Sequence, residues 1–221
     1  MNRKLWTLPL LLLAPIASHA VVIIDGNTFG RYNAGLGDLA ALDGPGGFFL
    51  LPVPLEGDPT LAPTIPLPFV PNVPALGTNW LAGNYGGVGS TWSAGPVAIP
   101  STWAVSTETA IVYNFILDAT SDLHIDLGVD NGILVWLNGN YIFGAQNSGG
   151  SSLNEYDIDL NGLTAGNYAL QILREDHGGA TGYDILATSV RAVPEPASLS
   201  LLGMGLLSLG LIRRRRKVAI S

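Results

Sequence analysis

Short runs of alternating apolar and polar residues dominate the second half of the chain. In the clearest run, 122–130, the odd positions are leucine, isoleucine or valine, and the even positions are aspartate, histidine or glycine. A period of two predicts a β-strand with one face buried. Residues 111–117 are apolar except at Asn114. This pattern predicts a strand that is covered on both faces.

Further strands are expected at 133–137, 141–143, 156–160, 168–172 and 183–190. Asn138-Gly139 accepts positive φ at both turn positions and predicts a tight hairpin between the first two of these strands. Short strands separated by polar turns favour an all-β fold, an antiparallel β-sandwich of the jelly-roll type.

The preceding part of the chain has a different composition. Residues 43–74 are crowded with prolines, which remove backbone donors, so an extended segment is predicted there. Residues 78–106 mix glycine, serine and proline with Trp80, Trp92 and Trp103. These tryptophans are expected to anchor irregular segments onto a core.

The N-terminus has the pattern of a Sec signal peptide. Arg3 and Lys4 precede an apolar stretch at 5–16, and small residues follow at Ser18 and Ala20. Cleavage is expected between Ala20 and Val21. The alternative, a retained membrane anchor, is less favoured because two prolines interrupt the stretch.

The C-terminus has three parts in order. Pro194-Glu195-Pro196 is followed by an uncharged run at 197–212 and by the cations Arg213, Arg214, Arg215, Arg216 and Lys217. As a helix, the run would extend roughly 24 Å against a hydrocarbon core of roughly 30 Å. The cations are expected to stay cytoplasmic, so the globular part lies outside the cytoplasm.

This ending resembles the PEP-CTERM sorting signal of Gram-negative bacteria that make exopolysaccharide. The resemblance covers 193–221 and implies that an exosortase of the inner membrane cuts the chain near Pro194-Glu195-Pro196. The mature protein would then reach the cell surface or the extracellular matrix. A permanent tail anchor behind a proline-rich hinge is the alternative, which the short apolar run disfavours.

Removing both ends leaves residues 21–193, which are expected to form one domain. This part has sixteen acidic residues but only Arg31, Arg174 and Arg191 as strong cations, a formal charge of −13. Such a body should repel nucleic acid. The chain has no cysteine, which excludes disulfides and thiol chemistry. Stability is therefore expected from packing or from a bound cation.

A second resemblance, to galactose-binding-like jelly-roll domains, covers roughly 110–190. It depends on Val129-Asp130-Asn131-Gly132 and on Val135-Trp136-Leu137-Asn138-Gly139. It implies a sandwich and contact with glycans, with exopolysaccharide as a candidate partner. The candidate ligand-binding residues are Trp136, Tyr141, Asp130, Asn131, Asp176 and Tyr183. For Trp136, burial in the core is the favoured alternative.

A polar cluster at 174–184 is the candidate metal site. The oxygen ligands considered for a structural calcium ion are Asp130, Asn131, Glu175, Asp176 and Asp184. The favoured alternative is a solvated turn in which aspartate and glycine supply the loop conformations.

Catalytic motifs are absent from the sequence. Outside the signal peptide the histidines are His124 and His177, and neither lies in a recognised nucleophile, zinc or phosphate-binding motif. We therefore expect a non-enzymatic surface or matrix protein with a structural or glycan-contacting role. The alternatives are a carbohydrate-binding module with a defined ligand and a surface hydrolase that uses paired carboxylates.

Overall fold

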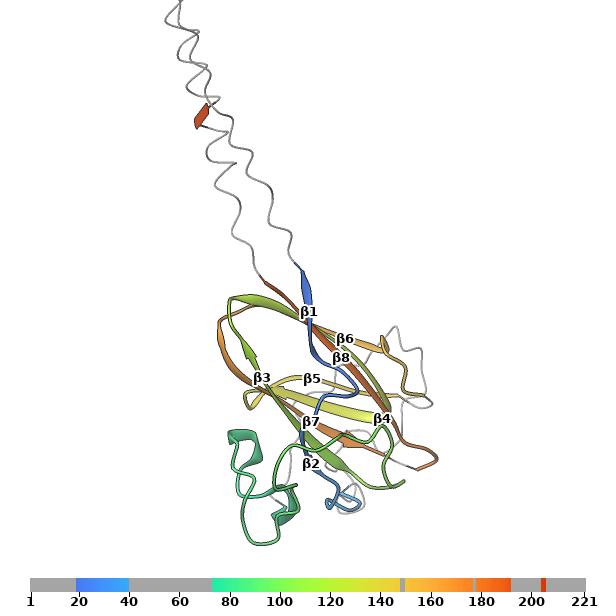
Figure 1. Cartoon of the computed structure of the whole chain (residues 1–221). Helices are drawn as coiled ribbons and strands as arrows, with labels where there is room; N and C mark the ends of the chain where they lie inside the picture. The colour runs from blue at the N-terminus through green and yellow to red at the C-terminus, as the bar shows by residue number, and fades with distance from the viewer. Residues whose placement is uncertain (1–18, 40–72, 148–149, 177, 192–203, 206–221) are drawn as a thin grey trace, which may run out of the picture. The chain divides into compact units, whose positions relative to one another are not determined.

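The computed structural model describes residues 19–39, 73–147, 150–176, 178–191 and 204–205, and Ala20–Arg191 form one compact unit (Figure 1). Its strands are β1 (Ala20–Ile24), β2 (Arg31–Asn33), β3 (Thr109–Leu117), β4 (Ser121–Leu137), β5 (Asn140–Asn147), β6 (Tyr156–Leu163), β7 (Gly166–Glu175) and β8 (Gly182–Arg191). Two short 3₁₀ helices, η3 (Pro74–Leu76) and η4 (Trp80–Ala82), precede β3.

Three predicted segments fall mainly outside the described residues: the signal peptide, the proline-rich stretch at 43–74 and the sorting segment at 194–217. Within the part of the chain that the structure describes, no helix is long and apolar enough to cross a membrane.

The strands form two antiparallel sheets that share β4. Its first part pairs with β6 and β8, which gives sheet I the order β1-β8-β4-β6. Its last part pairs with β5 and β7, which gives sheet II the order β2-β3-β7-β4-β5. Strands distant in the sequence are neighbours in both sheets, as in a jelly roll. The all-β, antiparallel prediction is confirmed.

The structure corrects one prediction about this region. Two separate strands were expected at 122–130 and 133–137, but β4 runs through the intervening Asp-Asn-Gly without a turn. A Cβ at Gly132 would lie 2.7 Å from Oε2 and 3.1 Å from Cβ of Glu175 on β7, so a larger residue there would displace the Glu175 side chain. Gly132 thus lets β4 approach β7 closely where β4 changes partners.

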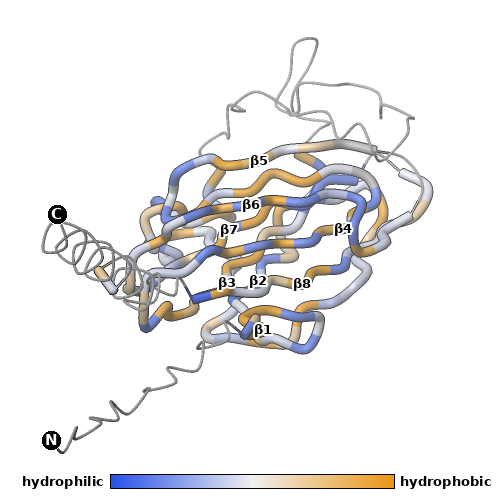
Figure 2. Tube along the Cα trace, turned by 90° about the horizontal axis from the view of Figure 1, so that it is seen from above, coloured by the Kyte–Doolittle hydropathy of each residue, from blue (hydrophilic) through white to orange (hydrophobic). Residues whose placement is uncertain are grey.

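The main core lies between the sheets. Alternate residues in both parts of β4 face it, including Leu123, Ile125 and Leu127 from sheet I and Ile133 and Val135 from sheet II. Figure 2 shows this alternation as hydrophobic and hydrophilic positions that follow one another along the strands. Burial of one face explains why the period of two was visible in the sequence.

A second apolar cluster lies on the outer face of sheet II, where the segment 73–92, here called the irregular cover, packs on it. Trp80 packs edge-on against Trp136 with ring centroids 5.5 Å apart, and it also contacts Trp92 at 5.8 Å. Gln171 on β7 fixes the irregular cover because its side-chain amide donates to the carbonyl of Leu81 at 2.8 Å. Trp80 and Trp92 therefore anchor this segment, as predicted.

The predicted hairpin is also present. Asn138 and Gly139 have φ of 49° and 77° and join β4 to β5. The strands β1 and β2 were not predicted. β1 is the edge strand of sheet I, and its first residue pairs with the end of β8, Ala20 opposite Val190 (Figure 1).

Candidate functional sites

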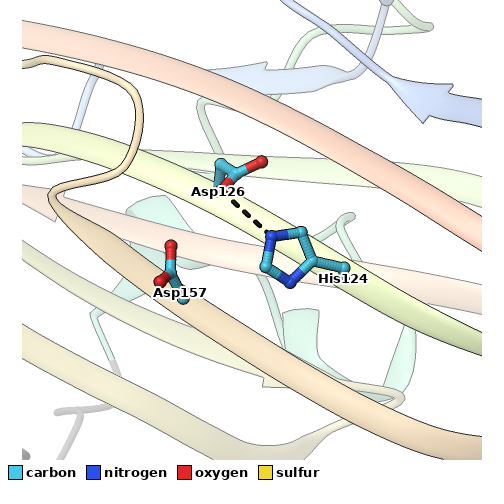
Figure 3. Close-up of side chains that lie close together, drawn as sticks. All are labelled: His124, Asp126 and Asp157. Atoms are coloured by element: carbon cyan, nitrogen blue, oxygen red, sulfur yellow. Dashed lines mark hydrogen bonds and ion pairs between the residues drawn. The ribbon is translucent and has the colours of Figure 1, made fainter.

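A histidine surrounded by aspartates lies on the outer face of sheet I. The antiparallel register places His124 opposite Asp159 and Asp126 opposite Asp157 on the neighbouring strand β6. Nδ1 of His124 lies 2.7 Å from Asp159, and Nε2 lies 3.1 Å from Asp126. Figure 3 shows the ring of His124 beside Asp126 on its own strand, with Asp157 close by on the adjacent strand.

This geometry favours a protonated imidazole. Both ring nitrogens face carboxylates at hydrogen-bond distance, and only the charged ring can donate from both. The hydrogen bond to Asp159, followed by the charge of Asp126, raises the pKa of His124 above its ordinary value, although partial burial opposes the shift. The cation also offsets the repulsion between Asp126 and Asp157, which lie directly opposite each other.

The same side chains have the donor types of a metal site. One ligand atom each from His124, Asp126 and Asp157 lies within 4.8 Å of the others. An ion would compete with existing hydrogen bonds, because both nitrogens of His124 already have carboxylate partners. The cluster is therefore better described as an ion-pair network on an exposed surface.

The predicted ligand-binding residues are mostly buried. Trp136 is 2% exposed and Tyr183 is 6% exposed, so neither offers an open ring for stacking on a sugar. Tyr141 is partly buried and packs on Trp136 with centroids 5.5 Å apart. Asp130 and Asp176 are also buried, and the side chain of Asn131 lies outside the described residues. The structure supports the alternative that Trp136 is a core residue.

Tyr183 instead contributes to an aromatic environment around a buried cation. The guanidinium carbon of Arg174 lies 4.2 Å from the ring centroid of Trp103 and 4.8 Å from that of Tyr183. Arg174 donates to Oγ1 of Thr109 at 2.9 Å and to the carbonyl of Pro100 at 2.9 Å. Burial lowers the pKa of Arg174. The contact with Tyr183 joins β7 of sheet II to β8 of sheet I.

The predicted calcium ligands lie on β4, on β8 and at the end of β7. Among the described residues, the grouped candidates for a metal do not include Asp130, Glu175, Asp176 or Asp184. One carboxylate oxygen of Asp176 accepts from the backbone N–H groups of Ser106 and Gly178, and Oδ1 of Asp184 accepts from the N–H of Ile185. Asp176 and Asp184 thus serve local backbone geometry here, as the turn alternative expects. His177 lies outside the described residues.

An open depression lies on the outer face of sheet II, near the end of β3 and the start of β7. Its volume is about 410 Å³. Its lining includes Asn114 and Ile116 from β3, Asn167 and Ala169 from β7, and Asn138 from the hairpin turn. Ile116 is 69% exposed. We call this feature the amide depression.

The amide depression was not predicted, but one feature of the sequence pattern is consistent with it. Asn114 is the single polar residue in the apolar run 111–117, and it occupies the face that is covered nearer the start of the same strand. The interruption marks where the outer face of sheet II emerges from its cover. Asn167 and Asn138 do not stand out in the sequence in this way, because asparagine is common in turns.

Comparisons with known proteins found one matching family model, the PEP-CTERM protein-sorting motif, at residues 192–217. A comparison with curated proteins found no match.

Several solved structures resemble the fold distantly. A GH2 beta-galacturonidase from Eisenbergiella tayi, bound to galacturonate, has a TM-score of 0.40 and 9% identity over 77% of this chain and 24% of that chain. The PA14 sugar-binding domain from an RTX adhesin has a TM-score of 0.29 and 19% identity over 44% of this chain and 51% of that chain. The PA14 domain of the MpAFP antifreeze protein has a TM-score of 0.30 and 16% identity over 44% and 48%. The chain thus spans about a quarter of the first structure and about half of the other two. Similarity of this extent does not identify a function.

The matched segment contains Pro194-Glu195-Pro196, the apolar run and the terminal arginines, the three parts that the sequence pattern brought together. The chain therefore carries a PEP-CTERM protein-sorting motif at its C-terminus and is an exported protein that is sorted through an exosortase.

Proposed function

We propose that this protein is a non-enzymatic component of the cell surface or the extracellular matrix, with a structural or glycan-contacting role. The observation that carries the proposal is the sorting motif at 192–217. Between the two terminal segments lies a compact β-sandwich whose charge of −13 suits a solvated, extracytoplasmic surface. The Sec machinery and an exosortase are its processing partners, and the precursor is held transiently in the inner membrane.

The roles of several acidic side chains support a non-enzymatic assignment. Burial raises the pKa of Glu155, a property found in catalytic acids. Its carboxylate, however, accepts backbone hydrogen bonds from Val129 at 3.0 Å and Ser152 at 3.1 Å. Glu155 therefore holds the 150–155 loop against β4. Asp176 holds the loop at Ser106 in the same way.

The register at the ends of the sandwich favours processing at both termini. Ala20 pairs with Val190, so the chain enters and leaves the compact unit on adjacent strands. Ala20, Val21 and Val22 are all exposed. A cut between Ala20 and Val21 would leave the remaining pairs of β1 with β8 in place.

Mass spectrometry of the protein recovered from its native cells tests the proposal. We expect a mature chain that begins at Val21 and ends near Pro194. Replacing Pro194, Glu195 and Pro196 together by alanine should leave the uncut precursor in the membrane fraction. Pro96→Ala is the control, because it removes an exposed proline outside the sorting motif and should leave processing unchanged. A basic tail retained on the wild-type protein would contradict the proposal and favour a permanent anchor.

A further inference from the structure

The exposed part of the outer face of sheet II has an ordered pattern of side chains. In the register of β3 and β7, Asn114 lies opposite Ala169 and Ile116 lies opposite Asn167. The two asparagines therefore alternate with apolar residues across the pair of strands. Nearer the start of β3, Ala110 and Val112 are buried in the cluster under the irregular cover, whereas Asn114 and Ile116 are exposed.

The amides of the depression are available to a ligand to different degrees. Oδ1 of Asn138 accepts from the N–H of Ala169 at 2.8 Å, which fixes the orientation of this side chain and leaves its NH₂ as a donor. Within the described part of the chain, the side chains of Asn114 and Asn167 make no hydrogen bond to protein atoms. Each therefore offers a carbonyl acceptor and an NH₂ donor.

The two strands that carry the depression are held firmly together. Phe115 and Tyr168, which also line it, lie opposite each other in the register and stack with centroids 5.5 Å apart and an interplanar angle of 17°. The hydroxyl of Tyr168 donates to the carbonyl of Thr164 at 2.7 Å, which further fixes the ring. The volume of about 410 Å³ lies within the roughly 300–1,000 Å³ range of small-molecule sites.

We propose that the amide depression binds a neutral saccharide, an inference that rests on the proposed glycan-contacting role and names its site and ligand class. Sugar hydroxyls both donate and accept hydrogen bonds, as the amides of Asn114 and Asn167 do. The C–H faces of a pyranose ring match the exposed side chain of Ile116. None of the described residues that line it carries a charge, and the charge of −13 on the surrounding body opposes an acidic polysaccharide.

Binding is best measured on the full chain purified in a detergent without a sugar headgroup. The result then does not depend on whether sorting and processing occur as proposed. The probes are short oligosaccharides of glucose, mannose, galactose and xylose, with oligogalacturonate as the acidic counterpart, and the method is isothermal titration calorimetry. We expect at least one neutral oligosaccharide to bind and oligogalacturonate not to bind.

Asn114→Ala and Asn167→Ala should each lower the association constant for that oligosaccharide by roughly tenfold, because each removes hydrogen bonds to the ligand. Asn161→Ala is the matched control, because Asn161 is an exposed asparagine on β6 of the other sheet, and it should leave binding unchanged. Ile116→Asp is a further, independent variant that places a charge in the depression and should abolish binding. Circular dichroism melting establishes that each variant is folded.

The inference is overturned if no neutral oligosaccharide binds, if only oligogalacturonate binds, or if the two depression variants bind as Asn161→Ala does. Correct processing without binding overturns this inference and leaves the surface-protein proposal standing. Binding by a chain that is never processed supports this inference and contradicts the surface-protein proposal.

Discussion

At the scale of single residues, His124 shows how the acidic surface contributes to stability. Asp126, Asp157 and Asp159 lie around one imidazole on neighbouring strands, and the three described arginines of the compact unit have other partners. When the ring is protonated, its charge offsets the mutual repulsion of the three carboxylates. Because the side chain of His124 is 41% exposed, solvent screening keeps this contribution small.

The raised pKa of His124 determines the direction in which its contribution to folding stability changes with pH. Its pKa is higher in the folded protein than the ordinary value of about 6.5. The stabilisation is therefore fully present below about pH 6.5 and is lost as the pH rises through the folded pKa. We predict that His124→Gln lowers the thermal midpoint at about pH 5.5 and changes it little at about pH 8.5.

A direct titration of the ring by NMR checks the cause. The pKa of His124 should lie above its ordinary value in the wild-type protein and fall toward that value in Asp159→Asn, since the hydrogen bond to Asp159 is the largest contribution. A wild-type pKa at or below the ordinary value, or an equal effect of His124→Gln at both pH values, would contradict this account.

Residue roles were predictable from the sequence where they follow from periodicity and not where they follow from tertiary contacts. The alternation at 122–130 correctly placed His124 on the polar face of its strand. The aspartates around it could not be foreseen, because the register between β4 and β6 is a long-range property. Likewise, the sequence left two roles open for Trp136, sugar binding and burial in the core. Its burial depends on a contact with Trp80, which lies 56 residues earlier in the chain.

At the scale of elements, β4 determines the architecture because it belongs to both sheets. Its sequence indicated two strands, since Asp-Asn-Gly is a common turn sequence. In the structure these residues instead belong to one continuous strand, and Gly132 allows a close approach to β7. The sequence pattern identified the residues of β4 and their faces correctly. It could not distinguish a turn between two strands from one strand that changes its pairing partners.

Gly128 provides a test of how tightly β4 is packed. A Cβ at this position would overlap the carbonyl group of Ser152, so the 150–155 loop would have to move. We predict that Gly128→Ala lowers the free energy of unfolding by about 2 kcal/mol, the typical cost of overpacking. Urea denaturation followed by circular dichroism measures this change.

Gly95→Ala is the control for this substitution, because a Cβ there meets no atom within 4 Å. It should change the free energy of unfolding by less than about 0.5 kcal/mol. Equal effects of the two substitutions would show that the loop does not pack on β4 as described.

At the scale of the whole molecule, the shared strand and the common core make the two sheets interdependent. Leu123 and Ile125 of sheet I and Ile133 and Val135 of sheet II lie on one strand and face one core. Arg174 of sheet II adds a cation–π contact with Tyr183 of sheet I. Neither sheet keeps a covered inner face without the other, so the compact unit is expected to unfold in one cooperative transition.

The distribution of tryptophans allows this cooperativity to be measured. Trp80, Trp92 and Trp136 pack together on the outer face of sheet II, and Trp103 packs on Arg174 of β7. In a Trp6→Phe background, fluorescence therefore reports sheet II and its surroundings. Leu123 is 1% exposed and faces the core from sheet I.

We predict that Leu123→Ala lowers the free energy of unfolding by about 3 kcal/mol, as is typical for truncating a buried leucine. Although the substitution is in sheet I, tryptophan fluorescence and far-ultraviolet circular dichroism should shift to the same lower urea midpoint, because β4 transmits the loss to both sheets. A fluorescence midpoint that stays at the wild-type value while the circular dichroism midpoint falls would show that the sheets unfold separately. The continuous strand would then join two independent units, and the core between them would contribute little to either.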